Sequence, residues 1–189
     1  IDLTLAGNAS LLLATTPIWT LGLSAAAGHE RPTAVITLGI VATLVGMTLV
    51  VWGGRQDLDL GGPRLRGDLL MMVGAILWSV YTVGGRKPIA KYGAVRVTAW
   101  TLWVGTPLLV LIGLPELLRT DLGAVSGLAW SGVVYTGIFS IGVAYLLWYR
   151  GVQRLGNNRT AVYSNLVPVA ALAAAWVWID EVPSWQQLV

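Results

Sequence analysis

The sequence contains no cysteine, one histidine and few charged residues. Without cysteine the chain can form no disulfide, no thiolate metal site and no cysteine nucleophile. A single histidine, His29, also leaves no histidine-rich metal site. Charged residues make up 11% of the chain, whereas soluble domains contain about 25%. So few charges cannot cover a water-facing surface, and the composition therefore predicts a protein surrounded by lipid.

The charged residues that are present divide the chain into six apolar windows, each without any charged side chain. Each window can hold a helix of roughly 17 to 25 residues, the length that spans a bilayer. Strict alternation of apolar and polar residues is absent, which argues against a barrel. We therefore predict an all-α polytopic membrane helix bundle. The expected helices cover residues 4–27, 33–53, 69–86, 96–115, 126–149 and 160–179.

The connections between these helices differ in lysine and arginine content. Those after the first, third and fifth helices contain eight such residues, and those after the second and fourth contain four. The positive-inside rule places the richer side in the cytoplasm and predicts a multi-pass protein of a bacterial plasma membrane. The net charge of +3 is small and its basic residues are interspersed with apolar runs, so nucleic acid is not an expected partner.

One segment pattern occurs twice. TTPIWTLGLSAAAGHERP, residues 15–32, and LVPVAALAAAWVWIDEVP, residues 166–183, each have a proline near the start and end in Glu-x-Pro. Three residue pairs are each 151 positions apart: Pro17 and Pro168, Glu30 and Glu181, and Pro32 and Pro183. The two segments belong to the first and sixth predicted helices, which cross the membrane in opposite directions. The pattern is typical of an inverted repeat, which secondary transporters use for alternating access.

If the repeat unit has five helices, the full protein has ten and this chain is a fragment. We expect residues 1–54 to hold the last two helices of the first repeat. Residues 55–67 would be the inter-repeat loop, and residues 68–189 the second repeat without its last helix. A cleaved signal peptide would not supply the membrane helices missing at the front.

The segment YLLWYRGVQRLGNNRTAVYSNLVPVAALAAAWVWIDEVPSW, residues 145–185, resembles the second repeat of EamA-type transporters of the drug/metabolite transporter superfamily. The resemblance consists of an aromatic helix end, a basic loop with Leu-Gly, a helix containing proline, and a closing Glu-x-Pro. Residues 15–32 resemble the corresponding part of the first repeat. The resemblance implies ten helices, cytoplasmic termini and transport of small organic solutes such as amino acids, metabolites or drugs, often outward. It implies no single substrate.

Six residues are candidates for a substrate-binding site: Asn165, Pro168, Trp78, Tyr81, Tyr135 and Pro17. Asn165 lies one turn before Pro168 on the same helix face. An amide in hydrocarbon is costly unless it is hydrogen-bonded, so Asn165 either contacts the solute or bridges two helices.

The two prolines and the aromatic residues each allow two interpretations. A mid-helix proline kinks its helix and can free a carbonyl toward a cavity, or it can serve packing alone. The rings of Trp78, Tyr81 and Tyr135 suit an amphipathic solute, but they can equally belong to helix packing.

Away from their ends, the predicted spans contain hydroxyl groups and one asparagine, Asn165, and they contain no His, Cys, Asp or Glu. An intramembrane enzyme would need such groups, so we predict no enzyme, no metal and no cofactor. Glu30 and Glu181 lie at helix ends, where surface anchoring is the favoured interpretation. Coupling to protons or another ion stays open, as does homodimer formation. The alternatives to an alternating-access transporter are an uncoupled facilitator or channel for small solutes, and a non-transport membrane scaffold.

Overall fold

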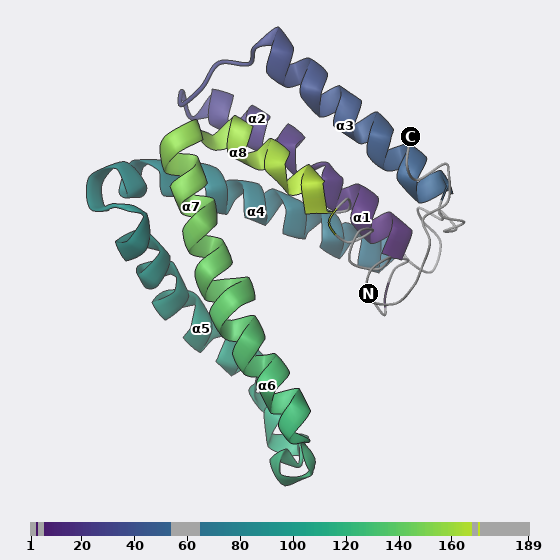
Figure 1. Cartoon of the computed structure of the whole chain (residues 1–189), viewed down its shortest axis with the longest axis vertical. Helices are drawn as coiled ribbons and strands as arrows, with labels where there is room; N and C mark the ends of the chain where they lie inside the picture. Colours follow the sequence, from purple (N-terminus) through teal and green to yellow (C-terminus); the bar gives the residue numbers. More distant parts are fainter. Residues whose placement is uncertain (1–2, 4–5, 54–64, 168–169, 171–189) are drawn as a thin grey trace. The chain divides into compact units, whose positions relative to one another are not determined.

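The computed structural model describes residue 3, residues 6–53, residues 65–167 and residue 170. Every regular element within these stretches is a helix, which confirms the predicted all-α bundle (Figure 1). Most of the predicted 55–67 loop and most of the second copy of the repeated segment lie outside the described residues. Both the inverted repeat and the division into repeats stay predictions.

The described residues form two compact units. Unit 1 contains the residues up to Gly84 and those from Leu155 onward, and unit 2 contains Gly85–Arg154. Unit 1 holds six helical elements: α1 (Ala6–Ala14), α2 (Thr16–Ala26), α3 (Ala34–Gly53), most of α4 (Leu65–Tyr92), α8 (Asn157–Tyr163) and the 3-10 turn η4 (Ser164–Leu166). Helix α2 packs against α8, and α1 packs against α3.

The first predicted helix, 4–27, is two helices separated at Thr15. Pro17 lies in the first turn of α2 and is fully buried. Because proline has no N–H, the carbonyl of Leu13 loses its usual partner four residues along. The Thr16 hydroxyl donates to that carbonyl instead, at 2.6 Å. This hydrogen bond stabilises the break between α1 and α2.

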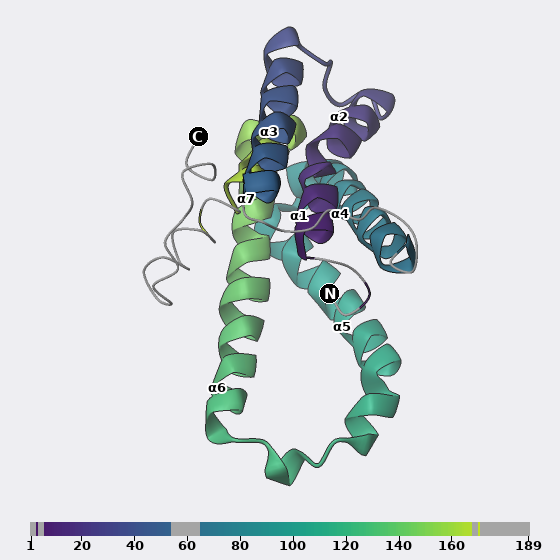
Figure 2. The same cartoon turned by 90° about the vertical axis from the view of Figure 1, so that its right-hand side faces the viewer.

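Unit 2 holds the end of α4, α5 (Ala94–Arg119), the 3-10 turn η2 (Leu122–Ala124), α6 (Gly127–Tyr135), the π-helix η3 (Thr136–Val143) and most of α7 (Ala144–Leu155). Figure 2 shows α5 and α6 joined through η2. The last three helices follow one another without a break, so the predicted helix 126–149 contains an unexpected π segment. Gly93 adopts a φ of +84° between α4 and α5, a backbone conformation that favours glycine.

Helix α4 extends beyond the predicted 69–86 at both ends, and α5 beyond the predicted 96–115. The residues predicted to connect them, 87–95, are helical except for Gly93. Charged residues mark where the apolar stretch ends, but backbone hydrogen bonding continues past them. Long side chains such as Lys87 and Lys91 can carry their charge to the membrane interface from a helical backbone.

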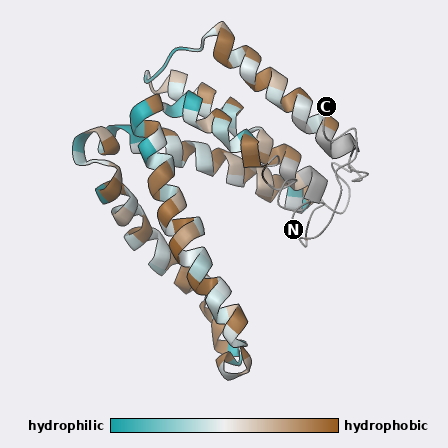
Figure 3. Ribbon diagram, in the orientation of Figure 1, coloured by the Kyte–Doolittle hydropathy of each residue, from teal (hydrophilic) through white to brown (hydrophobic). Residues whose placement is uncertain are grey.

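Three of the described helical stretches are long and apolar enough to cross a membrane: Leu65–Tyr92, Ala94–Arg119 and Gly127–Leu155. Shorter apolar helices cover Leu11–Ala26 and Ala34–Gly46. Figure 3 shows hydrophobic residues along α5 and α6, with hydrophilic residues at the turn between α4 and α5. These helices expose large apolar side chains, including Trp103, Ile112 and Leu128. Such exposure is expected where lipid is the solvent.

Candidate functional site

A row of buried hydroxyl groups lines one face of α2. Thr16, Thr20 and Ser24 recur every four residues and are almost completely buried. Residues four apart lie on one helix face, so α2 presents a polar stripe to its neighbours. The Ser79 hydroxyl of α4 donates to the Thr16 carbonyl at 3.1 Å, which joins the two helices across 63 residues of sequence. Ser79 and Thr82 are themselves fully buried.

The interior of unit 1 holds polar groups among small and aliphatic side chains, whereas many large apolar side chains lie on its exterior. On α4 the exposed side chains include Leu69, Leu70, Val73, Leu77 and Val80. Helix α4 therefore has hydroxyl groups facing inward and aliphatic groups facing outward, the reverse of a helix in a water-soluble protein. This arrangement is expected where lipid surrounds a protein with a polar interior.

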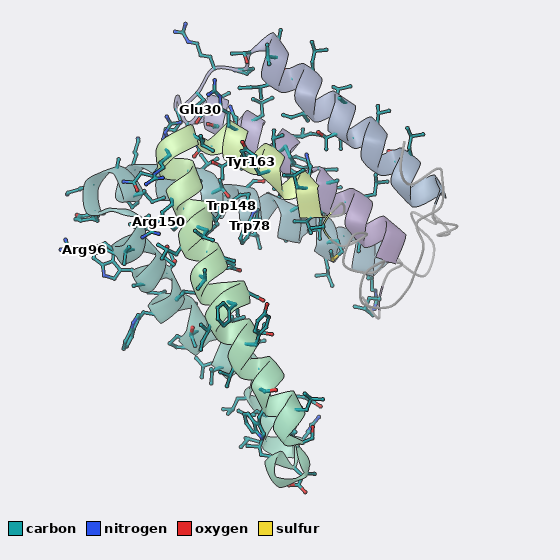
Figure 4. All side chains as sticks on the ribbon, in the orientation of Figure 1. Glu30, Trp78, Arg96, Trp148, Arg150 and Tyr163 are labelled. Atoms are coloured by element: carbon teal, nitrogen blue, oxygen red, sulfur yellow. The ribbon has the colours of Figure 1, made fainter. Side chains whose placement is uncertain are left out.

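The Glu30 carboxylate binds the start of α8 (Figure 4). Its Oε1 accepts the backbone N–H of Asn157 at 2.6 Å, and its Oε2 accepts the backbone N–H of Asn158 at 3.1 Å. The first N–H groups of a helix have no partner inside it, and a carboxylate satisfies them with charge-assisted hydrogen bonds. Glu30 follows α2, so this contact joins residues 127 positions apart and holds α8 beside α2.

Gly156 makes this close approach sterically possible. Its φ is +87°, in the left-handed region, and a Cβ at this position would meet Oε1 of Glu30. Any other residue would therefore be strained and would also collide with the carboxylate. We call Ser24, His29, Glu30, Gly156, Asn157 and Asn158 the α2–α8 polar cluster.

The amide of Asn157 continues the cluster inward. Its Nδ2 donates to the Ser24 hydroxyl at 3.1 Å and lies 3.5 Å from Nδ1 of His29. Several buried polar atoms have no hydrogen-bond partner within the described part of the chain: Oδ1 of Asn157, both amide atoms of Asn158, and Oγ1 of Thr20. An unsatisfied buried polar group costs about 1–3 kcal/mol. These atoms are therefore available to bind water or a polar solute group.

Four of the six predicted site residues belong to unit 1. Pro17 lies in the first turn of α2. Trp78 and Tyr81 lie one turn apart on α4 with ring centroids 5.4 Å apart, and both are partly buried. Asn165 lies in η4, is partly buried, and its Nδ2 has no partner among the residues that the structure describes.

The remaining two candidates lie outside the described part of unit 1. Tyr135 belongs to unit 2, where it ends α6; it is 61% exposed and its ring lies 5.1 Å from that of Phe139. Pro168 lies outside the described residues. The binding roles of all six residues stay predictions.

Sequence reasoning did not identify Asn157 and Asn158, because the segment RGVQRLGNNR was interpreted as a connection. The signal that could have revealed the start of α8 is Gly-Asn-Asn after a basic helix end, since glycine followed by small polar residues is typical of a helix start. Sequence reasoning also did not foresee the contacts of Glu30 with the backbone of α8, and its predicted role as a surface anchor stays a prediction. No group of three or more potential metal ligands occurs among the described residues.

Comparison with known proteins gives three findings. The model of the EamA-like transporter family matches residues 65–189. The chain is 25% identical over 169 residues to the uncharacterized transporter YyaM of Bacillus subtilis, covering 87% of this chain and 54% of that protein. It is 27% identical over 179 residues to a probable terminal-alkyne amino-acid exporter of Streptantibioticus cattleyicolor, covering 94% of this chain and 58% of that protein.

One crystal structure of a protein superposes with a TM-score of 0.81, covering 99% of this chain and 63% of the other, at 24% identity. That match shows the fold alone. The chain spans little more than half the length of the two curated relatives named above.

Proposed function

This chain belongs to the EamA-like transporter family, and on that premise we propose that the full protein moves small organic solutes across the cell membrane by alternating access. The family is one of multi-pass membrane transporters rather than enzymes. The observation that carries the proposal is the set of buried hydroxyl and amide groups inside unit 1, which is enclosed by helices with many exposed apolar side chains. A polar interior gives a solute hydrogen-bonding groups that the hydrocarbon core of the membrane lacks.

The chemistry of this interior favours a solute that combines an apolar part with hydrogen-bonding groups. The Thr20 hydroxyl and the Asn165 amide each have a buried polar atom without a hydrogen-bond partner among the described residues. The hydroxyls of Ser79 and Thr82 donate to the backbone of α2 and α4 and can only accept a further hydrogen bond. The adjacent rings of Trp78 and Tyr81 supply a flat apolar surface. We therefore propose a neutral or zwitterionic metabolite as the solute, in line with the relative named as a probable amino-acid exporter.

We propose efflux as the direction. The support is the similarity to a protein named as a probable amino-acid exporter. To test the direction, the full-length gene is expressed in cells, and metabolites in the medium and in the cytosol are measured by untargeted mass spectrometry. The same measurements on an empty-vector strain provide the reference. A compound class that rises outside and falls inside supports export and identifies the solute. The reverse change would refute export while preserving transport.

Asn165 provides the first test of a residue. We expect Asn165→Ala to reduce solute flux at least several-fold, because the variant loses a partly buried amide whose nitrogen has no partner among the described residues. Its yield in the membrane should match that of the wild type. The control is Ser131→Ala, which removes an exposed hydroxyl on α6 and should leave flux unchanged. Wild-type flux in Asn165→Ala would remove this residue from the site.

Two alternatives make different predictions for purified full-length protein in liposomes. An alternating-access carrier exchanges labelled solute for unlabelled solute across the bilayer and saturates. A channel equilibrates the solute without saturation and without accumulating label against excess unlabelled solute. An uncoupled facilitator that works as a carrier saturates and exchanges, but it does not respond to an imposed ion gradient. A scaffold produces no flux. A pH gradient or a sodium gradient imposed across the same liposomes tests coupling, since a coupled carrier concentrates the solute against its own gradient.

A further inference from the structure

One end of unit 2 carries a dense set of basic side chains. They come from the end of α4, the start of α5 and the end of α7: Arg86, Lys87, Lys91, Arg96, Arg150 and Arg154. Figure 4 labels Arg96 at the start of α5 and Arg150 on α7. The sequence has no acidic residue between Asp68 and Glu116, or between Asp121 and Asp180. This end of unit 2 is therefore locally cationic.

One of these cations, Lys91, lies beside a pair of aromatic rings. Nζ of Lys91 lies 4.9 Å from the centroid of the Tyr92 ring. That ring in turn meets Trp100 of α5 edge to face, with centroids 5.1 Å apart. Arg96 lies one helical turn before Trp100, on the same face of α5. The group therefore consists of two cations, Lys91 and Arg96, and two aromatic residues, Tyr92 and Trp100.

The apolar face of α5 continues directly from this group. Trp100 is 50% exposed, Trp103 is 80% exposed and Val104 is 67% exposed. Tyrosine and tryptophan favour the boundary between headgroups and acyl chains, where their polar and apolar parts are both satisfied. The aromatic pair therefore marks the depth at which a lipid changes from headgroup to chain.

We propose that Lys91, Tyr92, Arg96 and Trp100 form a binding site for an anionic phospholipid. The two cations hold the headgroup phosphate with charge-assisted hydrogen bonds, and the acyl chains lie along Trp103 and Val104. Basic groups between membrane helices bind anionic headgroups in this way, and the cytoplasmic leaflet is rich in them. A free phosphate would use the cations but gain nothing from the exposed apolar face, so the combination favours a lipid.

The test uses full-length protein purified in detergent and titrated with phosphatidylglycerol, with bound lipid counted by native mass spectrometry. We expect the double variant Lys91→Gln with Arg96→Gln to bind phosphatidylglycerol about 30-fold more weakly, which corresponds to about 2 kcal/mol for two cations. Phosphatidylcholine should bind weakly to both proteins.

Two controls separate a defined site from general charge attraction. The charge-preserving variant Lys91→Arg with Arg96→Lys should bind phosphatidylglycerol within a few-fold of the wild type, and it also shows that changes at these positions permit folding. Arg119→Gln removes a cation from the opposite end of α5 and should leave lipid binding unchanged.

Three results would overturn the proposal. Unchanged phosphatidylglycerol binding in the double glutamine variant would show that these cations hold no lipid. An equal loss in Arg119→Gln would indicate charge attraction without a site. Inorganic phosphate that competes with the lipid at equal concentration would indicate an anion site that does not use the acyl chains.

Discussion

Gly85 and Gly84 are adjacent glycines in α4 that should respond in opposite ways to substitution by alanine. A Cβ on Gly85 would lie 2.6 Å from Cε1 of Tyr149 and 2.7 Å from its Cζ and Oη. Tyr149 is 1% exposed, so its ring has little freedom to move away. A Cβ on Gly84 would have no heavy atom within 4 Å. Small residues allow such close helix contacts in membranes.

The magnitudes follow from these two environments. Replacing a helical glycine by alanine stabilises a helix by roughly 0.5–1 kcal/mol, and Gly84→Ala should show this gain. Gly85→Ala has the same gain but adds overpacking, which costs typically 1–3 kcal/mol. The contact of 2.6 Å is close enough that we expect the upper part of that range. Gly85→Ala should therefore be less stable than Gly84→Ala by about 2–3 kcal/mol.

The assay heats the full-length protein in detergent to a series of temperatures and measures the fraction that stays monodisperse by size-exclusion chromatography. The temperature at which half of the protein is lost gives the Tm. A difference of this size corresponds to a Tm about 5–10 °C lower for Gly85→Ala than for Gly84→Ala. Combining Gly85→Ala with Tyr149→Leu should recover part of the loss, because it removes the ring that the new Cβ meets. Equal Tm values for the two alanine variants would refute the reasoning, since they would mean that the Tyr149 ring moves without cost.

The polar cluster gives two further predictions, each measured as a Tm. Glu30→Gln should destabilise the protein by about 2 kcal/mol, because it removes the charge that binds two helix N–H groups. The control is Glu116→Gln at an exposed position, which should change the free energy of unfolding by less than about 0.5 kcal/mol. Gly156→Ala should destabilise the protein more than Gly93→Ala. Both glycines have a left-handed φ, but only at position 156 would the added Cβ also collide with the Glu30 carboxylate. Equal losses within either pair would count against the described contact.

Most of the fold could be predicted from the sequence because the relevant signals are local. Few charges and long apolar windows identified membrane helices, and the described α3, α4 and α5 each cover a predicted window. The family assignment also rested on short motifs, and the family match confirms it. Helix ends were less accurate, since α4 and α5 continue through residues whose charges had been taken as boundaries.

The candidate site was only partly predictable. Asn165 was predicted because an amide is costly in lipid without a partner, and Trp78 and Tyr81 because their rings suit an amphipathic solute. Neither inference needs a tertiary structure, and the binding roles stay predictions. Asn157 and Asn158 were missed because their surroundings depend on Glu30 and Ser24, which are more than a hundred positions away. The π-helix at Thr136–Val143 was also unexpected, since a segment of small and apolar residues reads as regular α-helix.

The sequence by itself determined that this protein is a helical membrane protein of a transporter family. The free energy of placing a window in lipid is close to a sum over its residues, so composition and spacing are enough to predict it. Only the tertiary structure decided that Glu30 holds the start of α8, that Gly85 lies against Tyr149, and that Lys91 lies over the Tyr92 ring, which meets Trp100. Such contacts depend on which helix faces meet, and that is set by packing among segments distant in the chain.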